Sequence, residues 1–215
     1  MNRCQSRKFI NSKTSTAAYC ETILPKLRPT LVVMIKEPRP GRVKTRLGRD
    51  LGMTAAAWWF RHQSAALLRR LDDPRWNLIL AVAPDHQGLM SRVWPARLPR
   101  VPQGTGNLGE RMARQLHLHR GPTCIIGADI PGILPSHIAQ AFKALGDHDA
   151  VFGPAPDGGY WLVGLKHAPK PGLFANVRWS TEHALADSRA TLPDACIATI
   201  ATLADVDTAT DLARF

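Results

Sequence analysis

The sequence predicts a single α/β domain built on a mostly parallel central sheet with helices on both faces. Apolar runs of strand length alternate along the chain with segments whose apolar residues recur at helical spacing. Most of these runs are apolar throughout, which is typical of strands buried on both faces. With 215 residues, of which 45% are hydrophobic, the chain can enclose one substantial core.

The first third of the chain contains two predicted strands and one long helix. Residues 31–35 form an apolar run, and residues 36–47, which contain two prolines and a glycine, are expected to be an irregular loop. Residues 53–71 then have the spacing of an amphipathic helix, and residues 78–83 form a second buried strand.

The middle of the chain continues the alternation. A helix is expected over residues 108–119, because Asn107 and Glu110 have the spacing of a capping box. Residues 123–128 form the third buried strand, and a helix beginning at Ser136 follows it.

Two more strands and a helix start complete the predicted fold. The strands comprise residues 150–152 and 160–165, and Thr208 and Asp211 have the spacing of a second capping box. Strands that alternate with helices in this way are usually parallel, with the helices covering both faces of the sheet.

The loop after the first strand carries five cationic side chains. A loop that leaves the carboxyl end of a parallel strand is where open α/β sheets bind ligands. Arg and Lys both bind phosphate oxygens, and Gly41 gives the loop conformational freedom. We therefore predict a nucleotide diphosphate site here. Its candidate residues are Lys36, Gly41, Arg42, Lys44 and Arg46.

Asp129 is the candidate catalytic carboxylate, because it follows the third buried strand in a turn that Pro131 restricts. A carboxylate in this position could hold Mg²⁺ or Mn²⁺ against a diphosphate. The alternative is that Asp129 merely caps the turn. Asp207 precedes the last helix start without capping it, so it could supply a second metal ligand.

The segment from Gly153 to Trp161 is the candidate acceptor site. Paired glycines allow close approach of the backbone to a ligand, aromatic rings can stack on a sugar or base, and Asp157 could accept a proton from a hydroxyl group. The alternative is an ordinary turn between two strands. The candidate acceptor residues are Gly158, Gly159, Tyr160, Trp179, Ser180 and Thr181.

A second glycine-rich segment, Gly104 to Gly109, matches the G-x-G-x-x-G fingerprint of dinucleotide-binding proteins. However, the run before it contains two prolines, whereas the fingerprint requires a central buried strand. We therefore interpret it as a loop beside the nucleotide, with Gln103 and Gly104 as candidate nucleotide-binding residues and Gln103 within reach of the base.

Charge is distributed unevenly along the chain, whose formal net charge is +11. Residues 1–50 hold 12 Lys/Arg and 3 Asp/Glu, and the remainder is nearly neutral. Residues 1–29 are interpreted as a basic, disordered tail, and residues 30–215 as the folded domain. No apolar run is long enough to span a membrane, and four scattered cysteines fit a reduced, cytoplasmic protein.

Several of these segments together resemble the DUF2064 family. They are Lys36 to Leu47, Asn107 to Met112, Ile126 to Pro131, Gly153 to Gly164, Trp179 to Thr181 and Asp205 to Thr208. The resemblance covers about residues 31–212. The family is commonly described as GT-A type glycosyltransferases, sometimes associated with arsenosugar biosynthesis, and is similar to molybdenum-cofactor and phospholactate guanylyltransferases.

The resemblance implies a Rossmann-like nucleotide-diphospho-sugar transferase (GT-A) fold, a first loop around the nucleotide phosphates and a metal at Asp129. One departure matters, because GT-A enzymes carry an Asp-x-Asp motif and this chain has Asp129-Ile130-Pro131. The second metal ligand would therefore come from elsewhere, and Asp207 is the candidate.

Three functions remain open at this point, and the first of them is the one we expect. The first is a metal-assisted glycosyltransferase that moves a sugar from a nucleotide sugar to a small acceptor. The second is a nucleotidyltransferase that joins a nucleoside triphosphate to a phosphorylated small molecule, since both reactions require stabilised phosphate oxygens. The third, remote alternative is a nucleic-acid-binding domain without catalysis, which the nearly neutral body disfavours.

Overall fold

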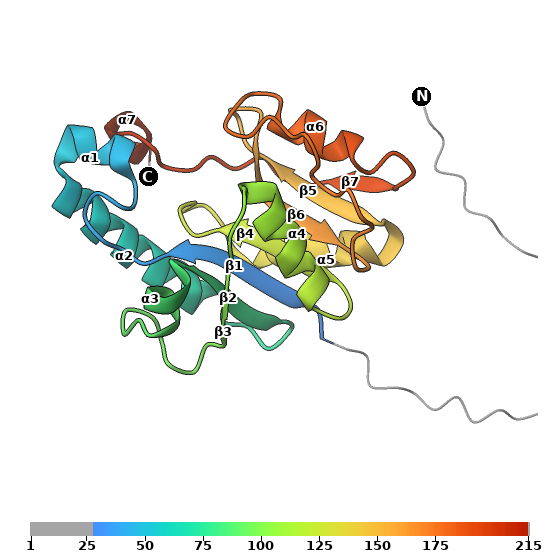
Figure 1. The fold of residues 1–215 in the computed structure, drawn as a ribbon, viewed down its shortest axis with the longest axis horizontal. Coiled ribbons are helices and arrows are strands. Elements are labelled where there is room, and N and C mark those ends of the chain that lie inside the picture. The colour runs from blue at the N-terminus through green and yellow to red at the C-terminus, as the bar shows by residue number, and fades with distance from the viewer. Residues whose placement is uncertain (1–27, 215) are drawn as a thin grey trace, which may run out of the picture.

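The computed structural model describes residues 28–214, and a seven-stranded sheet forms their centre (Figure 1). The strand order is β3-β2-β1-β4-β6-β5-β7. Nearly all of the predicted tail, together with Cys4, Cys20 and Phe215, lies outside the described residues. None of the helices in residues 28–214 combines the length and hydropathy needed to cross a membrane.

One half of the sheet is parallel. Its strands are β1 (Thr30–Lys36), β2 (Asn77–Ala83), β3 (Arg100–Pro102) and β4 (Thr123–Gly127). β1 lies between β2 and β4 and runs parallel to both, with Met34 opposite Gly127 at the carboxyl end. This position explains why the apolar run of β1 is continuous, since Leu31, Val32, Val33 and Ile35 are buried on one face or the other.

The other half of the sheet is mixed. It comprises β5 (Ala150–Pro154), β6 (Tyr160–Leu165) and β7 (Ile197–Thr199). β6 is antiparallel to β5, because residues 155–159 are too few for a crossover connection. β6 is also antiparallel to β4. β7 pairs with β5 in parallel. Since four of the six strand pairings are parallel, the predicted mostly parallel sheet is confirmed.

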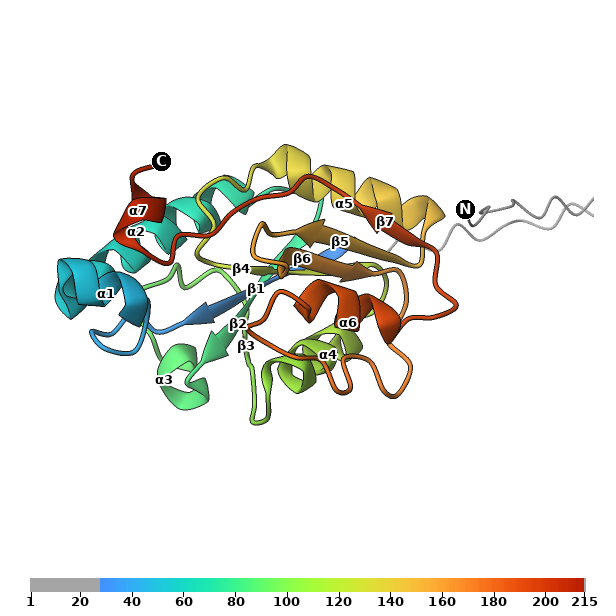
Figure 2. The same ribbon diagram turned by 90° about the horizontal axis from the view of Figure 1, so that it is seen from above.

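Helices cover both faces of the sheet, as predicted (Figure 2). They are α1 (Thr45–Leu51), α2 (Met53–Leu71), α3 (Asp85–Leu89), α4 (Leu108–Leu118), α5 (Pro135–Asp147), α6 (Ala184–Ala190) and α7 (Ala209–Leu212). α2 and α5 pack on one face, and α4 and α6 on the other. Successive residues of β1 alternate between the two cores, with Leu31 and Val33 in the first and Val32 in the second.

The structure corrects some predicted boundaries. The irregular loop after β1 ends at Lys44, and α1 begins at Thr45, so Arg46 belongs to a helix. The reason is Leu47, which is fully buried with Ala56 and so turns the end of the loop toward a small core. α5 begins at Pro135, one residue before the predicted Ser136, because proline suits the first helical position.

Both predicted capping boxes are present, at the starts of α4 and α7. The short elements α1, α3, α6, β3 and β7 were not predicted. Each has seven residues or fewer, which is too short for a hydrophobic period to be recognised. β3, which contains Pro102, lies at the edge of the sheet, where the missing N–H of a proline is tolerated.

Candidate active site

The loop after β1 and the turn after β4 converge at the carboxyl edge of the sheet. The strands are parallel neighbours, so their following segments leave at the same edge. The Lys44 Nζ atom lies 2.7 Å from the Asp129 Oδ2 atom. The cationic loop and the candidate catalytic carboxylate therefore share one site.

Two further carboxylates from the segment before α7 complete a cluster around Lys44. Its Nζ atom donates a hydrogen bond of 2.7 Å to Asp207 Oδ1 and lies 3.6 Å from Asp205 Oδ2. One oxygen from each of Asp129, Asp205 and Asp207 lies within 4.8 Å of the others. We call these three residues the acidic triad.

Asp205 was missed by the sequence analysis, although the chain holds a signal for it. Val206 is fully buried, and its N–H donates to the Asp129 carbonyl oxygen at 3.3 Å. In an extended segment the residues on either side of a buried one project together to the opposite side. The alternation of Asp205, Val206 and Asp207 therefore indicates that both carboxylates face the same site.

The triad carries more negative charge than one ammonium group neutralises. Burial lowers the pKa of Lys44, but Asp129 and Asp207 together outweigh it, so the net pKa is raised and the ammonium stays charged. Burial raises the pKa of Asp205 to about 6, and the neighbouring carboxylates add to this against the opposing effect of Lys44. Such crowding of acidic oxygens favours an additional cation.

Two cavities meet at Asp129, one of about 590 Å³ and one of about 250 Å³. Both are lined by Gly127 and Asp129 after β4, by Leu108 of α4, and by Trp179 and Ser180. A group bound at Asp129 would therefore face both cavities. We call them the large and the small cavity.

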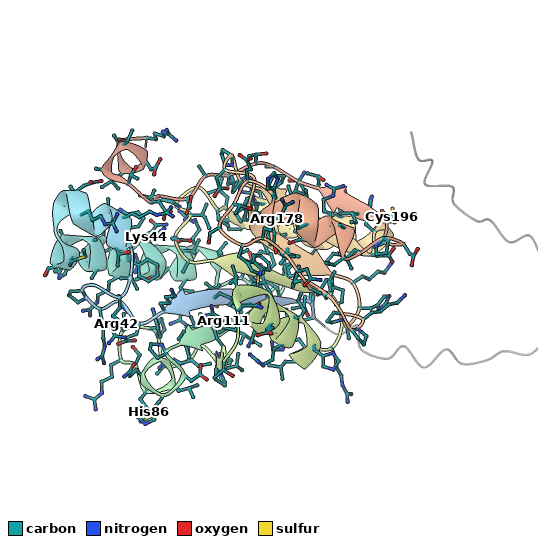
Figure 3. All side chains as sticks on the ribbon, turned by 45° about the horizontal axis from the view of Figure 1, so that its top comes forward. Arg42, Lys44, His86, Arg111, Arg178 and Cys196 are labelled. Carbon is teal, nitrogen blue, oxygen red and sulfur yellow. The ribbon has the colours of Figure 1, made fainter. Side chains whose placement is uncertain are left out.

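The large cavity is lined by cations. Four of the candidate phosphate ligands line it, namely Lys36, Arg42, Lys44 and Arg46, and Arg111 of α4 joins them. Arg42 and Lys44 lie in the loop after β1 and Arg111 on α4 (Figure 3). Arg111 lies far along the chain from that loop, and it was not a candidate in the sequence analysis, although it belongs to the resembling segment Asn107 to Met112.

The other candidate nucleotide-binding residues have structural contacts of their own. Gln103 is buried in the wall of the large cavity, where its Nε2 atom donates to the Ala81 carbonyl at 2.8 Å and its Oε1 atom accepts from Arg111 at 3.3 Å. It thus orients Arg111. Gly41 and Gly104 do not line either cavity; both have positive φ, and the Gly104 N–H donates to Asp85.

The small cavity combines carboxylates with aromatic rings. Most of the candidate acceptor residues line it, together with Asp157: Gly159, Tyr160, Trp179, Ser180 and Thr181. Gly158 does not. Its φ is +82°, and a Cβ atom there would collide with the backbone of Glu182, so this glycine permits a close approach of two chain segments.

Hydrogen bonds, a ring contact and an ion pair position the aromatic residues of the small cavity. The Tyr160 hydroxyl lies 3.2 Å from Ser188 Oγ, and its ring meets Trp179 edge-on at 6.4 Å. Burial raises the pKa of Tyr160, so the phenol remains neutral. Next to Trp179, the Arg178 guanidinium pairs bidentately with Asp187 of α6 at 2.9 Å. These contacts fix the segment that carries Trp179 and Ser180.

Several solved structures share this architecture. A candidate nucleotide-diphospho-sugar transferase of Desulfovibrio desulfuricans G20 superposes with a TM-score of 0.76 and 27% identity, over 87% of this chain and 85% of that chain. The fold is thus that of nucleotide-diphospho-sugar transferases and nucleotidyltransferases. The profile of one family, "Uncharacterized protein conserved in bacteria (DUF2064)", matches residues 66–181, and the chain belongs to this family.

Two more distant structures share the fold alone. A CMP:2-keto-3-deoxy-manno-octonic acid synthetase complexed with CTP has a TM-score of 0.53 and 11% identity, over 87% of this chain and 96% of that chain. The protein Rv0371c of Mycobacterium tuberculosis H37Rv, complexed with manganese, has a TM-score of 0.51 and 16% identity, over 87% and 97%. The search of curated proteins found no match. The comparison at 27% identity supports a nucleotide-dependent transferase, and the two distant structures support the fold.

Proposed function

We propose that the protein is a metal-assisted glycosyltransferase that moves a sugar from a nucleotide sugar to a small acceptor. The observation that carries this proposal is the position of Asp129 between two chemically different cavities. The large cavity, lined by five cations, suits a nucleoside diphosphate. The small cavity, lined by aromatic rings and Asp157, suits a sugar and its acceptor.

The acidic triad fits a hard divalent cation such as Mg²⁺ or Mn²⁺. Its donors are carboxylate oxygens, which these ions prefer, and the ligand atoms lie within 4.8 Å of one another. The Lys44 ammonium between them shows that they accommodate a positive charge. A bound metal ion would neutralise charge on the departing nucleoside diphosphate.

Different side chains bind the phosphates and accept the proton of the acceptor. Lys36, Arg42, Arg46 and Arg111 bind the phosphate oxygens, and Lys44 joins them when it leaves the triad. A hydroxyl oxygen of the acceptor forms a bond to the anomeric carbon of the sugar, whose bond to the diphosphate oxygen breaks. The hydroxyl proton passes to Asp157, which lies in the wall of the small cavity.

Nucleotidyl transfer is the second candidate, and the size of the cation set favours it. Five cations in one cavity are enough for a triphosphate, and a structure with the same fold is complexed with CTP. In that reaction the phosphate of a small molecule attacks the α-phosphorus, and pyrophosphate leaves. The products therefore separate the two reactions, because glycosyl transfer releases a nucleoside diphosphate.

Thermal shift measurements with nucleotide sugars and nucleoside triphosphates, each with and without Mg²⁺ or Mn²⁺, test the proposal. A ligand that binds the native state raises the melting temperature, and we expect the largest rise from a nucleotide sugar with metal. Asp129→Ala should abolish turnover of that ligand without changing the circular dichroism spectrum. Asp194→Ala, which removes an exposed carboxylate away from both cavities, is the matched control. Full activity of Asp129→Ala would remove this residue from the mechanism.

A further inference from the structure

Charge is segregated across Asp129. The large cavity is lined by Lys36, Arg42, Lys44, Arg46 and Arg111. The small cavity contains no Lys, Arg or His among its lining residues, and its ionisable groups are Asp129, Asp157, Asp205 and the neutral phenol of Tyr160. A ligand that spans both cavities would therefore pass from a positive to a negative environment.

We infer that the acceptor bound in the small cavity carries no phosphate or other negative charge, and that it is a neutral or cationic hydroxylated molecule with an apolar face. This inference rests on the proposed function, since it assigns the acceptor class to the same site. An anionic acceptor would lie against carboxylates and would meet no cation among the residues that line this cavity. The Lys44 ammonium, which pairs with Asp129 and lies near Asp205, lines the large cavity instead.

A metal ion at the triad would not make the small cavity favourable for an anionic acceptor. It would neutralise Asp129 and Asp205, but Asp157 belongs to the turn between β5 and β6 and is not a member of the triad. Its Oδ1 atom accepts only the N–H of Gly159 among the described hydrogen bonds, and its side chain is exposed. One uncompensated carboxylate would therefore still face the acceptor.

The uncharged residues that line the small cavity indicate which kind of acceptor it would bind. Trp179, Tyr160 and Trp161 present aromatic surface, and Leu108, Met112 and Leu203 add aliphatic surface. The C–H face of a sugar or polyol packs on such rings, and a cationic group is also attracted to them. The Ser180 side chain supplies a hydroxyl group for hydrogen bonds, whereas the Thr181 hydroxyl donates to the Arg178 carbonyl at 2.7 Å. Aromatic faces beside carboxylates thus select hydroxylated compounds that are neutral or cationic.

The electrostatic character of the small cavity can be measured directly with a cysteine probe. Ala155 lines this cavity, and its backbone forms hydrogen bonds with Gly158 and Gly159 in the turn between β5 and β6. Ala155→Cys, made in the full chain with Cys4, Cys20 and Cys196 changed to Ser, would react with methanethiosulfonate reagents of either charge. Cys124 remains as a buried thiol, and the same chain without the Ala155 change gives the background rate.

The measured quantity is a ratio of two rates of thiol modification, that with the cationic ethyltrimethylammonium reagent divided by that with the anionic ethylsulfonate reagent. The same ratio measured for free 2-mercaptoethanol is the reference. This ratio cancels the thiolate fraction of the cysteine. We expect it to be at least tenfold above that of 2-mercaptoethanol, with or without Mg²⁺. Arg42→Cys, in the large cavity, is the internal comparator and should give a ratio below that of 2-mercaptoethanol.

A ratio for Ala155→Cys at or below that of 2-mercaptoethanol would overturn the inference, because the cavity would then admit anions freely. Asp157→Lys, combined with Ala155→Cys, should lower the ratio, and Asp194→Lys should leave it unchanged. If Ala155→Cys does not fold, Thr181→Cys probes the same cavity, because Thr181 also lines it. No nucleotide is present, so this result is independent of the thermal shift test of the proposed function.

Discussion

Replacing Lys44 with methionine should destabilise the protein and at the same time strengthen its response to metal. The change removes the ammonium but keeps an unbranched side chain of similar length. The ammonium lies 2.7 Å from both Asp129 and Asp207 and 3.6 Å from Asp205, and the Lys44 side chain is only 6% exposed. Without it, three acidic groups remain close together with no buried cation between them.

The magnitude follows from this geometry. Removing one partner of a buried ion pair costs about 3–5 kcal/mol. The three carboxylates are 30%, 42% and 36% exposed, so solvent screens part of their repulsion and we expect a loss of about 2 kcal/mol in the free energy of unfolding. For a domain of this size the melting temperature should fall by about 4–8 °C.

Thermal denaturation in EDTA, and then in Mg²⁺ or Mn²⁺, is the assay. We expect the metal to raise the melting temperature more in Lys44→Met than in the wild type, because no ammonium competes for the triad. Lys143→Met, which changes an exposed lysine on α5, is the control. An unchanged melting temperature in EDTA, or a smaller metal response than in the wild type, would refute the reasoning.

Two further predictions concern the walls of the cavities. Arg111→Ala should weaken nucleotide binding by about 1–3 kcal/mol, which is about 5- to 150-fold in the Kd measured by calorimetry. Arg75→Ala is the control and should not weaken binding, because among the described salt bridges Arg75 pairs only with Asp73. Equal affinities for the two variants would contradict the role of Arg111. Asp187→Asn should lower stability at pH 7, because hydrogen bonds from Arg178 lower the pKa of Asp187 from 3.8 to about 2. A lowered folded-state pKa gives stability that is present above pH 3.8 and lost as pH falls through about 2, so the variant and the wild type should converge there. A difference in melting temperature that persists at pH 2 would exclude this cause.

The buried strands and the longer helices were predicted well, because the hydrophobicity of neighbouring residues in the sequence indicates which residues are buried. The central residues of β1, β2 and β4 are continuously apolar, since helices cover both faces of these strands. The starts of α4 and α7 were marked by capping boxes, which are local interactions over four residues. The antiparallel insertion of β6 between β4 and β5 was not predicted, because strand neighbours depend on long-range pairing.

The site was predicted in part for a similar reason. Lys44 and Asp129 each follow a strong strand signal, and parallel strands bring their carboxyl ends to one edge. Neither Arg111 nor Asp205 directly follows a predicted strand, since the first lies on a helix and the second in an irregular segment. Gln103 and Gly104 were placed near the nucleotide by motif, but only the side chain of Gln103 lines the large cavity.

The sequence by itself determined the α/β class, the buried strands and the positions of the cationic loop and of Asp129, because these depend on residues adjacent in the chain. Only the tertiary structure decided that Lys44 lies within three carboxylates, and that cations line one side of Asp129 and acidic and aromatic groups the other. Electrostatic environment depends on distances in space, and those distances join segments that lie far apart in the sequence.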